Sequence, residues 1–274
     1  MRRLIAPIAL AALLAAASAS AAPPLTRLRL LPNAVAFRDR LHGVLGTGYR
    51  NETGYRGGAI ETTSDGGRTW RVAVWTPRPV VALTRVGSDY VAQYDDGETL
   101  RSRSGLRWTP VPVSTAGIAT DSSDCPQGLT AATNAGADDW ALCTTQPGAG
   151  NQGKAVYRFG THGWKRVAYT PFASAKGYGG IASYGYPLGI AANDDGFGLI
   201  WESRGTLYST PDGGRHWRPH PKIARPEIDF GSWAFVLPHG GVGWVVLEHG
   251  GTRGRRLLET TDSGRTWRLV HSWR

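Results

Sequence analysis

The stretch STPDGGRHWRP (residues 209–219) has two close copies in the chain, TTSDGGRTWRV at residues 62–72 and TTDSGRTWRLV at residues 260–270. Weaker versions are SRSGLRWTPV from Ser102 and FGTHGWKRVA from Phe159. The tryptophans of these copies are Trp70, Trp108, Trp164, Trp217 and Trp267. A repeat of roughly 40 to 55 residues indicates a fold built from repeated structural units.

The residues of each strong copy predict the turn of a β-hairpin. An aspartate side chain hydrogen-bonds backbone amides within a turn, glycine supplies positive φ, and tryptophan begins the returning strand with a large apolar face. β-prone runs flank the copies, as in GTLYST before Asp212, and two more precede each hairpin, as in PLGIAAN and FGLIWES. Five units of four antiparallel strands predict an all-β fold, a five-bladed β-propeller.

The expected domain organisation is a signal peptide over residues 1–21, a lead-in over 22–32 and one propeller over 33–274. A basic start, an apolar run over residues 4–17 and the small residues Ala19-Ser20-Ala21 are typical of a secretory leader. The alternative, a membrane anchor, needs a run of about 20 apolar residues. We therefore expect an exported protein, periplasmic or extracellular. LTRLRLLP (residues 25–32) is a candidate to close the ring by pairing with the last blade.

Charge and cysteine content narrow the partner class. The formal net charge is +10, and loss of Arg2 and Arg3 with the leader would leave +8. A scattered basic surface favours an anionic partner, and the lack of a dense basic tract argues against a specific nucleic-acid site.

Cys125 and Cys143 suit one structural disulfide in an exported protein. We expect no metal and no cofactor, because histidines and cysteines lack metal-site spacing.

The strong copies resemble the Asp-box, or BNR repeat, whose pattern is Ser-x-Asp-x-Gly-x-x-Trp. The matching residues are Asp65, Gly67 and Trp70; Asp212, Gly214 and Trp217; and Asp262, Gly264 and Trp267, with Thr63, Thr210 and Thr260 at the serine position. Propellers with such repeats include sialidases, sortilin-like receptors and photosystem II assembly factors. GTLYSTPDGGRHW is most similar to the last group. The weak copies lack the aspartate, with Arg103 and Phe159 in its place.

The ligand surface is predicted on the face opposite the Asp-box turns, which carries the longer loops. Arginine and tyrosine there suit anionic or sugar ligands. The candidate ligand-binding residues are Tyr49, Arg50, Tyr55, Arg56, Tyr178, Tyr184, Tyr186, Arg204 and Arg253. Simple solvation of polar loops is the alternative for each residue.

The function expected from these features is that of a non-enzymatic binding scaffold, assembly-factor-like or receptor-like. Its partner would be a protein or an anionic glycan, and the chain would be a monomer. These features are also compatible with peripheral association of the protein with a membrane complex. The alternative is a sialidase-like exo-glycoside hydrolase. Such enzymes carry a Phe/Tyr-Arg-Ile-Pro element, whereas AFRDR (residues 36–40) lacks the Ile-Pro. No catalytic residue is assigned; Glu202 and Glu248 are the candidates if the chain is a hydrolase, because most glycosidases need two opposed carboxyl groups.

Overall fold

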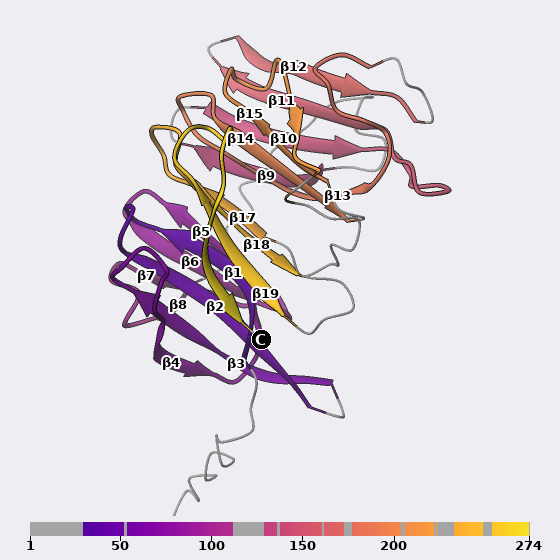
Figure 1. Ribbon diagram of the computed structural model, residues 1–274. Coiled ribbons are helices and arrows are strands. Elements are labelled where there is room, and N and C mark those ends of the chain that lie inside the picture. Colours follow the sequence, from indigo (N-terminus) through magenta and orange to yellow (C-terminus); the bar gives the residue numbers. More distant parts are fainter. Residues whose placement is uncertain are drawn as a thin grey trace, which may run out of the picture.

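The computed structural model describes residues 30–51, 54–111, 129–135, 138–160, 162–172, 177–203, 206–221, 223, 233–248 and 254–273. Within these residues the structure contains β-strands and no helix, and the strands form five four-stranded sheets (Figure 1). Strands that neighbour each other within a sheet follow one another in sequence and run antiparallel. The predicted all-β fold, a propeller of five four-stranded blades, is confirmed.

The blades follow one another along the chain. Blade 1 comprises β1 (Leu30–Phe37), β2 (Gly43–Asn51), β3 (Gly54–Thr63) and β4 (Arg71–Thr76). Blade 2 comprises β5 (Val80–Val86), β6 (Asp89–Tyr94), β7 (Thr99–Ser102) and β8 (Thr109–Val111). Blade 3 comprises β9 (Leu129–Ala135), β10 (Asp138–Thr144), β11 (Lys154–Gly160) and β12 (Gly163–Thr170). Blade 4 comprises β13 (Tyr186–Ala192), β14 (Gly198–Ser203), β15 (Leu207–Thr210) and β16 (Arg218–Pro219). Blade 5 comprises β17 (Trp233–Val236), β18 (Gly243–Glu248), β19 (Arg255–Thr260) and β20 (Arg268–Trp273).

Apolar clusters between the blades hold the sheets together. One cluster joins blades 5, 1 and 2, and at its centre the rings of Phe37 and Trp244 stack with centroids 3.8 Å apart. Other clusters join blade 4 to blade 5 and blade 3 to blade 4. Among the described strands no comparable contact joins β5 to β9, so the packing runs from blade 2 through blades 1, 5 and 4 to blade 3 (Figure 1).

The start of the first blade differs from the expectation. β1 begins at Leu30, inside the expected lead-in, and residues 30–32 pair with Tyr49, Gly48 and Thr47 of β2. The last blade already contains four strands of its own. Residues 30–32 therefore belong to blade 1, and residues 25–29 of the candidate closing segment lie outside the described residues.

Candidate functional site

The turns of each blade define two faces of the propeller. Turns between the first and second strands and between the third and fourth strands emerge together, because the strands alternate in direction. We call the surface that these turns form the turn face. The loops between second and third strands and the connections between blades form the opposite surface, the loop face.

The three aspartate turns, residues 63–70, 210–217 and 260–267, share one hydrogen-bond pattern. In the first, the Thr63 hydroxyl and the Thr69 amide donate to Asp65 Oδ1 at 2.8 and 2.9 Å, and the Gly67 amide donates to Thr63 Oγ1 at 2.9 Å. The other two turns repeat these bonds. The second glycine has a φ of +88° at Gly67, a conformation that favours glycine. In all three turns the threonine at the serine position donates its hydroxyl to the aspartate and accepts the glycine amide.

Hydrogen bonding fixes the charge of these aspartates. Burial by itself would raise the pKa of Asp65, but bonds from Thr69 and Thr63 outweigh it and lower the pKa to about 2. The pKa of Asp212 is lowered by His216 against the same effect of burial, and that of Asp262 by Thr266. The carboxylates are ionised near neutral pH, and their oxygens accept hydrogen bonds within the turns.

The tryptophan closes each turn onto the sheet. Trp217 is buried, donates from Nε1 to the Gly214 carbonyl at 2.9 Å and meets the edge of Trp140 with centroids 6.4 Å apart. The turn of blade 2 keeps the corresponding bond from Trp108 to Gly105, at 2.9 Å, although it has no aspartate. Ser102 Oγ also accepts the Gly105 amide at 2.9 Å, as Thr63 accepts that of Gly67, so this turn keeps the hydroxyl, glycine and tryptophan contacts without the aspartate.

Sequence reasoning missed a second feature of the aspartate turns, a pair of arginines that flanks each tryptophan. All three turns read Gly-Arg-x-Trp-Arg, and all six arginines are exposed: Arg68 and Arg71, Arg215 and Arg218, Arg265 and Arg268. The signal was available in the repeat itself, because these positions lie outside the Asp-box pattern yet are the same in every strong copy. The repeated turns therefore place arginines at corresponding positions on blades 1, 4 and 5 of the turn face.

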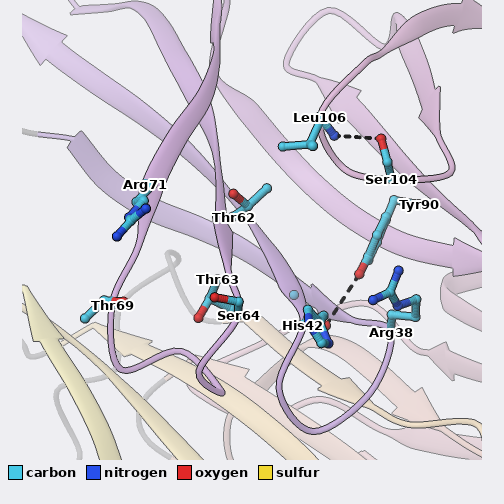
Figure 2. Close-up of a pocket in the computed structure, with 11 residues that line it drawn as sticks. Arg38, His42, Thr62, Thr63, Ser64, Thr69, Arg71, Tyr90, Ser104 and Leu106 are labelled. Carbon is cyan, nitrogen blue, oxygen red and sulfur yellow. Dashed lines mark hydrogen bonds between the residues drawn. The ribbon is translucent and has the colours of Figure 1, made fainter.

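A pocket of about 330 Å³ opens on the turn face between blades 1 and 2 (Figure 2). We call it the blade 1–2 pocket. Its lining residues are Arg38, His42, Gly43, Thr62, Thr63, Ser64, Thr69, Arg71, Tyr90, Ser104 and Leu106. Figure 2 shows Arg71 on one side, Arg38 and His42 on the other, and Thr62 and Thr63 between them. None of the lining residues is acidic, so the pocket presents positive charge and hydroxyl groups.

A second pocket, of about 250 Å³, lies between blades 5 and 1. Arg40, Arg68 and Arg268 line it together with Asp65 and Glu259. Arg268 forms an ion pair with the buried carboxylate of Glu259, and Arg40 Nη2 lies 3.9 Å from it. Much of the arginine charge here is therefore balanced within the protein.

The two candidate carboxylates lie at corresponding strand ends of neighbouring blades, β14 and β18. Glu202 is fully buried, and its Oε1 lies 2.6 Å from the Nζ atom of Lys154, also fully buried. Lys154 donates to the carbonyls of Ala182 and Tyr184 at 2.7 and 2.9 Å. Burial raises the pKa of Glu202 to about 7 against the lowering effect of Lys154. The side chain of Glu248 lies outside the described residues, so the separation of the pair stays untested.

The residues predicted to bind a ligand are only partly described. Tyr178 and Tyr184 are about half exposed, and the Tyr186 hydroxyl accepts the Gly150 amide at 3.0 Å. Tyr49 lies on blade 1, where it is half-buried. The structure places the other three tyrosines in or next to the connection between blades 3 and 4. Outside the description lie the side chains of Arg50, Tyr55 and Arg56 and the whole of Arg204 and Arg253. The predicted surface therefore stays a prediction.

The predicted disulfide also falls partly outside the described residues. Cys143 is buried in β10, whereas Cys125 lies outside the described residues, so their disulfide stays a prediction. In the described ranges no group of three or more histidine, cysteine or acidic side chains could hold a metal ion. No helix in the same ranges is long and apolar enough to cross a membrane.

Comparison with known proteins gives likeness of fold. No family model matches the sequence, and no curated protein matches it either. Among solved structures, YCF48 from Cyanidioschyzon merolae is 15% identical with a TM-score of 0.32, covering 89% of this chain and 85% of that one. A structure described as YCF48 bound to D1 peptide is 17% identical with a TM-score of 0.30, covering 88% of this chain and 81% of that one. A GH43 enzyme from Xanthomonas citri complexed with xylose is 9% identical with a TM-score of 0.42, covering 82% of this chain and 83% of that one.

Proposed function

We propose that this chain is a non-catalytic binding scaffold that holds an anionic partner against its turn face. The observation that carries the proposal is the Gly-Arg-x-Trp-Arg motif, which places exposed arginines at corresponding positions on three blades. Guanidinium groups bind carboxylate, phosphate and sulfate through paired hydrogen bonds. A rigid face with regularly placed arginines suits an extended anionic partner.

The charges of the turn face support this reading. The aspartates of the turns accept hydrogen bonds from their own threonines and amides. Asp39 accepts the amides of Leu41 and His42, and Asp195 accepts that of Gly240. These carboxylates are thus engaged locally. Of the turn arginines, Arg268 pairs with Glu259 and Arg68 donates to the Asp65 carbonyl, whereas the other four are exposed on the surface. We infer that the turns are Asp-box repeats whose variable positions carry the binding function.

The contrast with the hydrolase alternative rests on Glu202. A general acid or nucleophile must reach the bond that is cut. Glu202 is fully buried against Lys154 and has no exposed surface. We therefore favour the scaffold, and we place it outside the cytoplasm on the strength of the predicted leader in residues 1–21.

The test measures binding of fluorescein-labelled polyglutamate by anisotropy at about 0.05 M and about 0.5 M NaCl, because salt screens exposed charges. Arg215→Glu reverses one turn arginine, and Arg78→Glu reverses an exposed arginine that lies in the connection between blades 1 and 2 on the loop face and pairs with Asp96. We expect Arg215→Glu to weaken binding at low salt by about threefold or more and Arg78→Glu to leave it unchanged. Equal affinity for all three proteins would refute the turn face as the binding surface.

A further inference from the structure

We propose that the blade 1–2 pocket binds a phosphate or sulfate monoester group carried by an organic molecule. This inference rests on the proposed function, because it assigns a discrete anion site to the same turn face. It concerns a pocket between blades 1 and 2, whereas the repeated arginines extend over blades 1, 4 and 5.

The positive groups of the pocket are available to a ligand. Arg71 is exposed, and although its backbone pairs with Thr62, its guanidinium group makes no hydrogen bond or ion pair within the described part of the chain. Arg38 contacts Asp39 only through Nε, at 3.4 Å, which leaves the end of its guanidinium group unoccupied in that contact. His42 donates from Nδ1 to Asp39, so its neutral ring adds no donor to the pocket. Two arginines, Arg38 and Arg71, thus line one cavity that has no acidic lining residue.

Hydroxyl groups add donors between these side chains. In the described ranges the hydroxyls of Thr62 and Ser64 make no hydrogen bond. Ser104 accepts the Leu106 amide at 3.1 Å and keeps its own proton for another acceptor. A tetrahedral oxyanion presents several acceptor oxygens in different directions, whereas a carboxylate presents two in one plane. Donors that reach the cavity from several sides therefore favour the tetrahedral group (Figure 2).

The size and rim of the pocket favour an ester over a bare ion. Its volume of about 330 Å³ lies at the lower end of the range for small-molecule pockets. Leu106, which is 57% exposed, and the ring of Tyr90 line the pocket on the side of Ser104 (Figure 2). An ester could place its oxygens against the arginines and its organic part against Leu106 and Tyr90. The free ion would leave this apolar surface uncovered.

The experiment is isothermal titration of the full chain with phenyl phosphate, phenyl sulfate, inorganic phosphate and benzoate. We expect one site for phenyl phosphate or phenyl sulfate, with weaker binding of inorganic phosphate and benzoate. Arg71→Gln should weaken ester binding by about tenfold or more, because a charge-assisted hydrogen bond is lost. Leu106→Ala should reduce the difference in affinity between phenyl phosphate and inorganic phosphate, because it removes apolar surface that contacts the phenyl ring. Arg78→Gln, away from the pocket, is the charge-matched control.

Several outcomes would overturn the inference. They are the absence of a saturable site for either ester, benzoate binding as tightly as the esters, and an Arg71→Gln effect no larger than that of Arg78→Gln. Inorganic phosphate binding as tightly as phenyl phosphate would identify a free-ion site and refute the ester. If polyglutamate binding still depends on Arg215 in these cases, the scaffold proposal stands and only the pocket inference fails.

Discussion

At the scale of single residues, the tryptophan of each aspartate turn connects local geometry to the core. Trp217 lies 4% exposed between its own turn and Trp140 of blade 3, and its indole nitrogen satisfies the Gly214 carbonyl. Trp75, in the exposed outer strand β4, is 48% exposed. The same residue type thus has a structural role at one site and mainly a surface position at the other.

This contrast predicts the effect of truncation. Trp217→Ala should lower the free energy of unfolding by about 3 to 5 kcal/mol, because it removes a large buried ring and leaves a cavity. Trp75→Ala should change it by about 1 kcal/mol or less, as surface substitutions do. Urea unfolding followed by circular dichroism measures both. A loss below about 1 kcal/mol for Trp217→Ala would show that this ring does not pack as described.

At the scale of elements, blades 3 and 4 are joined by a charged pair inside the protein. Lys154 begins β11, Glu202 lies near the end of β14, and the lysine also holds two carbonyls of the connection between the blades. A buried pair of this kind contributes little compared with apolar packing, yet loss of one partner leaves the other charge uncompensated.

Lys154→Met should therefore destabilise the protein by about 3 to 5 kcal/mol at pH 8. The sign of the pH dependence follows from Glu202, whose pKa is raised by burial to about 7 even with Lys154 present. Without the lysine the pKa rises further, so the folded state binds more protons than the unfolded state and stability falls as pH increases from about 4.5.

The penalty of Lys154→Met should consequently be smaller at pH 5, where Glu202 is protonated, than at pH 8. Lys154→Met/Glu202→Leu, which removes both charges, should recover much of the stability at pH 8. Urea unfolding at the two pH values provides the measurement. An equal penalty at both would contradict a buried, ionisable Glu202.

The elements of the fold could be predicted from the sequence, whereas the pockets and the buried pair could not. Asp65, Gly67 and Trp70 specify a turn through contacts within a few residues, and repetition of that pattern gave the blade architecture. The blade 1–2 pocket combines Arg38 and Thr62 with Ser104, which the chain brings together only when two blades pack. Burial of Glu202 likewise depends on Lys154 from the preceding blade, so its position at a strand end suggested an exposed group instead.

At the scale of the whole molecule, blade packing gives the turn face a fixed arrangement. Phe37 and Trp244 stack across the first and last blades, and the buried Asn193 of blade 4 donates to the carbonyls of Leu237 and Gly240 beside blade 5. The arginines of the three aspartate turns therefore sit on blades that pack against one another. Because these positions are already ordered in the free protein, binding of an anionic partner costs less conformational entropy.

Recognition by the turn face is tested by comparing the two faces of the propeller in one binding assay. Polyglutamate affinity is measured for the unmodified protein, for Arg68→Gln/Arg215→Gln/Arg265→Gln and for Arg78→Gln/Tyr178→Ala/Tyr184→Ala, with melting temperatures as the check on folding. We expect the first variant to lose about tenfold or more in affinity and the second to bind as the unmodified protein does. Retained binding by the turn-face variant together with loss in the loop-face variant would contradict this expectation and assign recognition to the loop face.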